Sequence, residues 1–148
     1  MEPTRALLRR MAIATNRIDG TYYLISRAMG ATENAVALLY ALDDGEAHTQ
    51  KQISQEWLIP KTTLNTIVKE CVSEGYIRLE PHAREKTLRL TEAGRAYAKA
   101  LLEPLYAAEG RAMEAVLSDA SPEFVTALER FAQELQSEFD RYIVARRE

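Results

Sequence analysis

The stretch "KTTLNTIVKEC", residues 61–71, carries two kinds of side chain at helical spacing. Its apolar residues recur at i, i+3, i+4 and i+7, which predicts a helix with one buried face. The other face carries short polar and basic side chains. Such a face suits a helix in the major groove of DNA, where base edges present donors, acceptors and thymine methyl groups. The apolar positions are Leu64, Ile67, Val68 and Cys71, and the candidate DNA-binding positions are Lys61, Thr62, Thr63, Asn65, Thr66 and Lys69.

A basic hairpin is predicted shortly after this helix. The segments "YIRLE" (76–80) and "KTLRL" (86–90) alternate apolar and polar residues, which indicates two strands. Between them, "PHAREK" (81–86) reads as the tip of the hairpin and carries Arg84 and Lys86. A basic tip can reach phosphates or the adjoining minor groove while the helix occupies the major groove.

Local signals define the elements that must hold this helix and hairpin. Thr49 and Gln52 form a capping-box pattern, so a short helix should begin at residue 50 and carry Ile53 and Trp57 inward. The segment "LIP" (58–60) then turns the chain, and Gly75 is suited to end the second helix. Two helices joined by a turn and followed by a basic hairpin predict a winged helix-turn-helix.

Longer helices are predicted on both sides of this winged helix. Apolar residues recur at helical spacing from residue 4 to about residue 29, and Thr32 is placed to cap a second, buried helix. Thr91 can cap a long helix that Pro104 should kink. The pair Ser121 and Pro122 fits the N-cap and first position of a last helix. Its apolar stripe is Phe124, Leu128, Phe131, Leu135, Phe139 and Tyr142.

Composition limits the function classes. The 148 residues fit one domain, and no apolar run is long enough for a membrane span. Arginines stand where a signal peptide needs apolar residues, so we expect a cytoplasmic protein. One cysteine and two distant histidines predict no metal site, and no motif indicates an enzyme or a cofactor.

Charge is unevenly distributed along the chain. The net charge of −3 alone argues against a nucleic-acid partner. However, residues 1–30 and 59–95 carry net charges of +3 and +2, whereas 31–58 and 96–148 carry −4 each. Ordinary surface variation also accounts for such a modest imbalance.

From Thr49 to Gly94 the sequence resembles the MarR family of bacterial transcription regulators. The resemblance rests on "TQKQIS", on "KTTLNTIVKECVSEGYI" and above all on "REKTLRLTEAG". The last segment carries the family's wing pattern in Arg84, Lys86, Leu90, Thr91 and Gly94. Two positions depart from the family: His82 stands where an acidic residue usually holds the wing arginine, and Pro60 stands where relatives often have a capping serine.

The resemblance implies one MarR-like domain over 1–148, with a DNA-binding lobe at 32–95 and dimerisation helices at 1–30 and 96–148. It implies a homodimer that binds double-stranded DNA at a pseudo-palindromic operator, as a repressor released by a small aromatic or phenolic effector. Base contacts then fall to Thr62, Thr63, Asn65 and Thr66, phosphate or guanine contacts to Lys61 and Lys69, and wing contacts to Arg84 and Lys86. A ligand cleft would involve Tyr22, Tyr23, Ser26, Arg27 and Tyr40.

Three alternatives stay open. The winged helix could serve as a protein-interaction module with little DNA binding, which the acidic net charge and His82 favour. The two lysines could simply be solvated. Cys71 could sense oxidants, but its place on the apolar stripe favours a buried small hydrophobe with a high thiol pKa.

Overall fold

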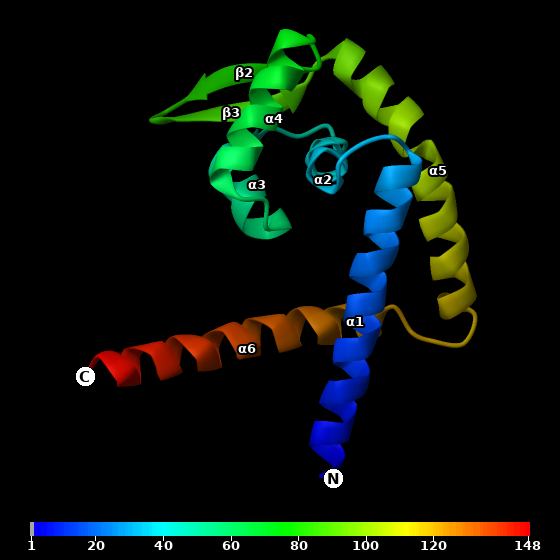
Figure 1. Cartoon of the computed structure of the whole chain (residues 1–148), viewed down its shortest axis with the longest axis vertical. Coiled ribbons are helices and arrows are strands. Elements are labelled where there is room, and N and C mark those ends of the chain that lie inside the picture. The colour runs from blue at the N-terminus through cyan, green and yellow to red at the C-terminus, as the bar shows by residue number, and fades with distance from the viewer. Residues whose placement is uncertain (1) are drawn as a thin grey trace. The chain divides into compact units, whose positions relative to one another are not determined.

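The computed structural model describes residues 2–148, in which helices predominate and the strands form one small sheet (Figure 1). The chain divides into two compact units, the first ending at Leu105 and the second running Tyr106–Glu148. The predicted fold class, mostly helical with a small β-wing on a winged helix-turn-helix, is confirmed. The helices are α1 (Pro3–Ala28), α2 (Glu33–Leu42), α3 (Gln50–Trp57), α4 (Lys61–Ser73), α5 (Glu92–Leu117) and α6 (Glu123–Arg147). The strands are β1 (His48–Thr49), β2 (Ile77–His82) and β3 (Glu85–Leu90).

Side-chain caps begin two of these helices where the sequence predicted them. The hydroxyl oxygen of Thr32 accepts a hydrogen bond from the N–H of Ala35 at 3.2 Å and so caps α2. At α3, the N–H of Gln52 donates to the Thr49 hydroxyl at 3.1 Å, and the N–H of Thr49 donates to the Gln52 side chain at 3.0 Å. The predicted capping box is therefore confirmed.

The end of α4 is also the one predicted. Gly75 has a φ of +81°, in the left-handed region that a glycine adopts without steric cost. Its N–H donates to the carbonyl oxygen of Val72 at 3.1 Å, and the N–H of Tyr76 donates to that of Cys71 at 2.8 Å. This pair of bonds is a Schellman motif, which satisfies the last carbonyls and sends the chain into β2.

The sheet has the strand order β1-β3-β2 and is antiparallel throughout. The prediction of a six-residue hairpin tip is wrong in extent, because β2 runs to His82 and β3 begins at Glu85. Only Ala83 and Arg84 form the turn, and Ala83 closes it with a φ of +53°. β1 was not predicted, since two residues are too short to show alternation; it pairs His48 with Leu88.

The loop before β1 is held by a side-chain contact between His48 and Asp44. Nε2 of His48 lies 2.8 Å from a carboxylate oxygen of Asp44, and the N–H of Glu46 donates to the same carboxylate at 2.9 Å. Partial burial raises the pKa of Asp44, but these hydrogen bonds outweigh it and hold the pKa below its ordinary value. The loop is thereby fixed beside the wing.

The core of the first unit is built around α2. Leu38 and Leu42 are fully buried, and α2 packs against α1, α3, α4 and β3. Trp57 was predicted to point inward, but its side chain is 39% exposed. It is the last residue of α3, and its ring lies tilted against that of Tyr40 at a centroid distance of 5.4 Å, so only one side is covered. Further core residues are Ile53, Ile59, Leu64, Val68, Ile77, Leu88, Leu90, Ala98, Leu102 and Leu105.

Thr91 joins the sheet to α5. The N–H of Gly94 donates to the Thr91 hydroxyl oxygen at 3.0 Å, which confirms the predicted cap. The same hydroxyl donates to the carbonyl oxygen of Gly75 at 2.6 Å, and the N–H of Thr91 donates to that of Tyr76 at 3.0 Å. The entry to α5 and the exit from α4 are therefore one hydrogen-bonded junction.

The start of α6 differs by one residue from the predicted one. α6 begins at Glu123 and not at Pro122, although the Ser121 hydroxyl does accept a bond from the N–H of Glu123 at 3.2 Å. Pro104 lies inside α5, as expected, and the kink at this residue stays a prediction. None of the side chains of α6 is buried within the described chain, and its apolar stripe is exposed except at Phe131, which is half-buried. Within residues 2–148, the helices all lack the combination of length and apolar character that a membrane span needs.

Candidate nucleic-acid interface

The two faces of α4 are separated as the sequence indicated. Leu64 is fully buried, Val68 is 3% exposed, and Ile67 and Cys71 are half-buried, so these four residues attach the helix to its lobe. Contacts with α2, α3 and β2 hold this side. Among the candidate residues on the other side, Lys61, Thr62, Asn65, Thr66 and Lys69 are exposed and Thr63 is half-buried.

The first turn of α4 has no side-chain cap. Pro60 is the N-cap residue, and its ring offers no acceptor for the first N–H groups. The first intrahelical bond runs from the N–H of Leu64 to the Pro60 carbonyl oxygen at 2.8 Å. The preceding N–H groups and the positive end of the helix dipole therefore favour an anion such as a DNA phosphate beside this turn.

Thr66 uses its hydroxyl proton within the helix. The hydroxyl donates to the carbonyl oxygen of Thr62, one turn earlier, at 3.1 Å. What remains on the exposed side is the methyl group and the hydroxyl lone pairs. Thr66 is thus suited to accept a hydrogen bond or to contact a thymine methyl group, and the exposed amide of Asn65 beside it can donate and accept.

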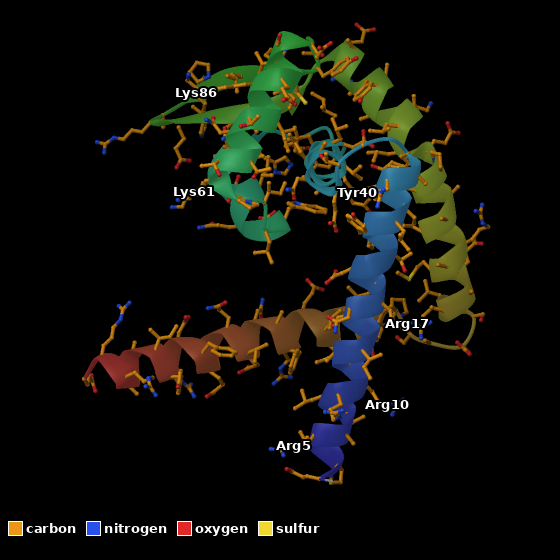
Figure 2. All side chains as sticks on the ribbon, in the orientation of Figure 1. Arg5, Arg10, Arg17, Tyr40, Lys61 and Lys86 are labelled. Atoms are coloured by element: carbon orange, nitrogen blue, oxygen red, sulfur yellow. The ribbon has the colours of Figure 1, made fainter. Side chains whose placement is uncertain are left out.

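The wing presents its two candidate cations at and beside the turn. Arg84 occupies the second turn position and Lys86 is the second residue of β3, opposite Pro81 in the register. Both side chains are exposed. Figure 2 shows Lys61 at the start of α4 and Lys86 on the wing, both on the side of the lobe that faces away from α1. Helix and wing therefore offer positive charge on a common side.

At the base of the wing, a carboxylate holds two further arginines. A carboxylate oxygen of Glu80 lies 2.7 Å from Nη2 of Arg78 and 3.6 Å from Nε of Arg89. Nη1 of Arg89 also donates to the carbonyl oxygen of Gly45, at 2.6 Å. This network ties β2 and β3 to the loop before β1, and sequence reasoning missed it. The signal was the cross-strand pairing of Arg78 and Arg89, which only the register reveals.

His82 ends β2 and pairs with Glu85 across the hairpin. It is exposed, as is Arg84 two positions later. The carboxylate of Glu80, deeper in the sheet, is engaged by Arg78 and Arg89 and not by Arg84.

Cys71 lies half-buried on the inner side of α4. Burial, followed by the negative charges of Glu70 and Glu74, raises the pKa of its thiol. A raised thiol pKa lowers the thiolate fraction at neutral pH, which agrees with the prediction of a small hydrophobe of low reactivity.

The five residues proposed for a ligand cleft do not share one surface: some are covered and others face outward. Ser26 is buried, and its hydroxyl donates to the carbonyl oxygen of Tyr22 at 2.8 Å. Tyr23 and Arg27 are exposed on α1, and the Arg27 guanidinium lies 5.8 Å from the Tyr23 ring centroid. Tyr40 lies on α2 against Trp57. Tyr22, Ser26 and Tyr40 thus belong to partly or fully covered surfaces, and the other two do not.

Comparison with known proteins finds one matching family model, which covers the DNA-binding lobe. The sequence model of the MarR family matches residues 29–86, which span α2, the helix-turn-helix and most of the wing. A comparison with curated protein sequences finds no match.

Solved structures with the same fold extend the likeness. The MarR family regulator NMB1585 from Neisseria meningitidis is similar with a TM-score of 0.74 and 23% identity, over 92% of this chain and 98% of that one. The MarR family transcriptional regulator SPO1453 from Silicibacter pomeroyi DSS-3 gives 0.69 and 23%, over 87% and 94%. The transcriptional regulator BldR from Sulfolobus solfataricus gives 0.60 and 16%, over 95% and 99%. The chain therefore has the MarR fold, and the resemblance inferred from its sequence is confirmed.

Proposed function

We propose that the chain is a dimeric, sequence-specific DNA-binding transcriptional regulator. One observation carries the proposal: α4 buries Leu64 and Val68 and exposes Lys61, Asn65 and Lys69 on its other side. A helix with this division can enter a major groove while its own lobe holds it. The exposed Arg84 and Lys86 on the wing support a second contact to the phosphate backbone.

The dimer is supported by the terminal helices. None of the side chains of α6 is buried within the described chain, and Leu128, Leu135 and Phe139 are each more than two-fifths exposed. On α1, Leu7 and Ile13 are likewise open. Exposed apolar surface of this extent is typical of a protein interface, and a second copy of the chain would cover it. We therefore assign residues 1–30 and 96–148 to dimerisation and 32–95 to DNA binding.

Two-fold symmetry specifies the form of the operator. Two α4 helices related by such an axis would read half-sites about one helical turn apart, roughly 34 Å centre to centre. We propose a pseudo-palindromic operator and repression of the gene that it controls.

Release by a small aromatic or phenolic effector completes the proposal. Tyr22 and Tyr40 supply aromatic surface on α1 and α2, while Arg27 offers a positive charge on α1 for an anionic group. The test is thermal unfolding with a panel of phenols and aromatic carboxylates. A compound that raises the melting temperature and also releases DNA supports this part. A panel that changes neither property counts against it.

The DNA-binding part is tested by an electrophoretic mobility shift with the region upstream of the gene. We expect a discrete complex that unlabelled upstream DNA displaces and scrambled duplex does not. Lys61→Ala combined with Arg84→Ala should abolish the complex while leaving the circular dichroism spectrum unchanged. If upstream and scrambled DNA compete equally well, the winged helix is better explained as a protein-interaction module.

A further inference from the structure

Leu58 combines two unfavourable features in the turn between α3 and α4. Its backbone has a φ of +51° and a ψ of +42°, in the left-handed region that costs a bulky side chain steric energy. Among the non-glycine residues of 2–148, only Leu58 and Ala83 have a positive φ. Its side chain is also 84% exposed, the largest value among the exposed large hydrophobic residues. A glycine would remove both costs.

The rest of the turn is firmly held, so Leu58 does not lie on a loose segment. On one side, the Trp57 ring lies against Tyr40. On the other, Ile59 is 1% exposed, and its carbonyl oxygen accepts a hydrogen bond from the Ser54 hydroxyl at 2.8 Å. These anchors fix the backbone on both sides of Leu58 and leave its side chain pointing out of the lobe.

The position of Leu58 relative to the proposed interface suggests its partner. It precedes Lys61, the first residue of α4, by three positions, and Pro60 between them is exposed as well. The N-terminal residues of a recognition helix are those that approach base edges. An apolar side chain beside them meets one apolar group on those edges, the thymine methyl.

We propose that Leu58 contacts a thymine methyl group at the edge of each half-site and so helps to determine the operator sequence. The inference rests on the proposed function, because it requires that α4 enter the major groove. Strained backbone is characteristic of functional sites, where the surrounding structure enforces a conformation that the residue itself disfavours. At this turn, Trp57 and Ile59 provide that enforcement.

The test combines variants of the protein with variants of the DNA. Binding is measured by fluorescence anisotropy, starting from overlapping duplexes of about 30 base pairs, which hold two half-sites one turn apart. In the duplex that the wild type selects, each thymine is then replaced in turn by deoxyuridine, which removes only the methyl group. The proteins are the wild type, Leu58→Gly, Leu58→Asn and Leu58→Met.

We expect Leu58→Gly to raise the melting temperature by about 2–4 °C. It should also weaken operator binding by about five- to tenfold for each half-site, the effect of losing a partly buried leucine. Leu58→Asn should weaken binding similarly, because asparagine accepts the left-handed backbone but offers no apolar contact. Leu58→Met keeps an apolar side chain and should bind within about twofold of the wild type, since leucine and methionine exchange at low cost.

Deoxyuridine identifies the group that is contacted. At one thymine in each half-site, loss of the methyl should weaken wild-type binding by about fourfold, the effect of one buried methylene-sized group. The same replacement should leave binding by Leu58→Gly unchanged. Ala83→Gly relieves the other left-handed residue and should keep the wild-type response to deoxyuridine, which separates relief of strain from loss of the contact.

Three outcomes would overturn the proposal. One is a more stable Leu58→Gly with unchanged affinity, which would make the exposed leucine a by-product of the turn. Another is weaker binding by Leu58→Gly with no thymine sensitive to deoxyuridine, which would move the contact to a sugar. If the wild type selects no duplex, the proposed function fails and this inference fails with it. Selective wild-type binding with either of the first two outcomes refutes this inference alone.

Discussion

Replacing Gly94 by alanine tests the junction that holds the wing to α4. A Cβ atom on Gly94 would overlap the carbonyl oxygen and carbon of Tyr76, which are backbone atoms and cannot rotate away. That oxygen also accepts the hydrogen bond from Thr91 at 3.0 Å. Gly94→Ala therefore forces the residue that leads into β2 away from the first turn of α5.

The magnitude follows from opposing contributions. Forcing a methyl group into a filled site costs about 1–3 kcal/mol, and weakening one backbone hydrogen bond costs about 1 kcal/mol. Better helix propensity of alanine returns up to about 1 kcal/mol. We expect a net destabilisation of about 2 kcal/mol, which corresponds to a fall in melting temperature of about 4–8 °C.

Urea and thermal unfolding, followed by circular dichroism, measure this effect. Gly20 in α1 and Gly110 in α5 are matched controls, because a Cβ on either would meet no atom within 4 Å in the described chain, apart from its chain neighbours and the adjacent backbone of its own helix. Gly20→Ala and Gly110→Ala should each stabilise the protein by about 0.5–1 kcal/mol. If Gly94→Ala behaves like the two controls, the close approach to Tyr76 does not hold the junction.

Other predictions concern the interface, the first helix of the pair and the cysteine. Asn65→Ala should cost about 1–3 kcal/mol of operator binding and relax selectivity at one base position, as an affinity scan over substituted duplexes would show. Lys69→Ala should weaken binding to all duplexes alike and lower the salt slope by about one per subunit; an unchanged slope would mean that the lysine is only solvated. Thr49→Ala should lower the free energy of unfolding by about 1 kcal/mol. Gln52→Ala should cost less stability in the Thr49→Ala protein than in the wild type, because both residues belong to one capping box. Burial raises the pKa of the Cys71 thiol, so as the pH rises this thiol loses its proton at a lower pH in the unfolded chain than in the folded protein. Wild-type stability should then fall more steeply than that of Cys71→Ala above pH 9.0, the ordinary thiol pKa, in urea unfolding from about pH 8 to about pH 10.

The parts of the fold that the sequence predicted are those fixed by local chemistry. The caps at Thr32 and Thr49 and the left-handed glycine at Gly75 act within a few residues, so their signals can be read directly. The buried face of α4 followed from helical periodicity alone. Each of these features depends on spacing along the chain and on no distant partner.

The parts that the sequence missed depend on distant partners or on backbone geometry. β1 exists only because His48 and Thr49 pair with β3, some forty residues later. The extent of the hairpin depends on the positive φ of Ala83, a conformation that an alanine in the sequence gives no reason to expect. Trp57 was expected to point inward with Ile53, one turn earlier, but it ends α3 and meets Tyr40 on one side only.

The candidate site shows the same division. The exposed residues of α4 were predicted by the pattern that predicts the helix, and the structure exposes nearly all of them. The link from Glu80 to Arg78 and Arg89 appears only when the strands are in register. The left-handed backbone of Leu58 likewise has no counterpart in composition or periodicity.

The most direct test of DNA binding as the function of this winged helix is the salt dependence of its affinity for upstream DNA. Fluorescence anisotropy with the upstream duplex and with a scrambled duplex, over a series of salt concentrations, gives selectivity and slope together. If the winged helix binds DNA as proposed, two subunits bind each site selectively, and the affinity falls steeply as salt rises, because several lysines and arginines displace counterions from phosphates. Equal affinity for both duplexes, or an affinity independent of salt, would contradict it.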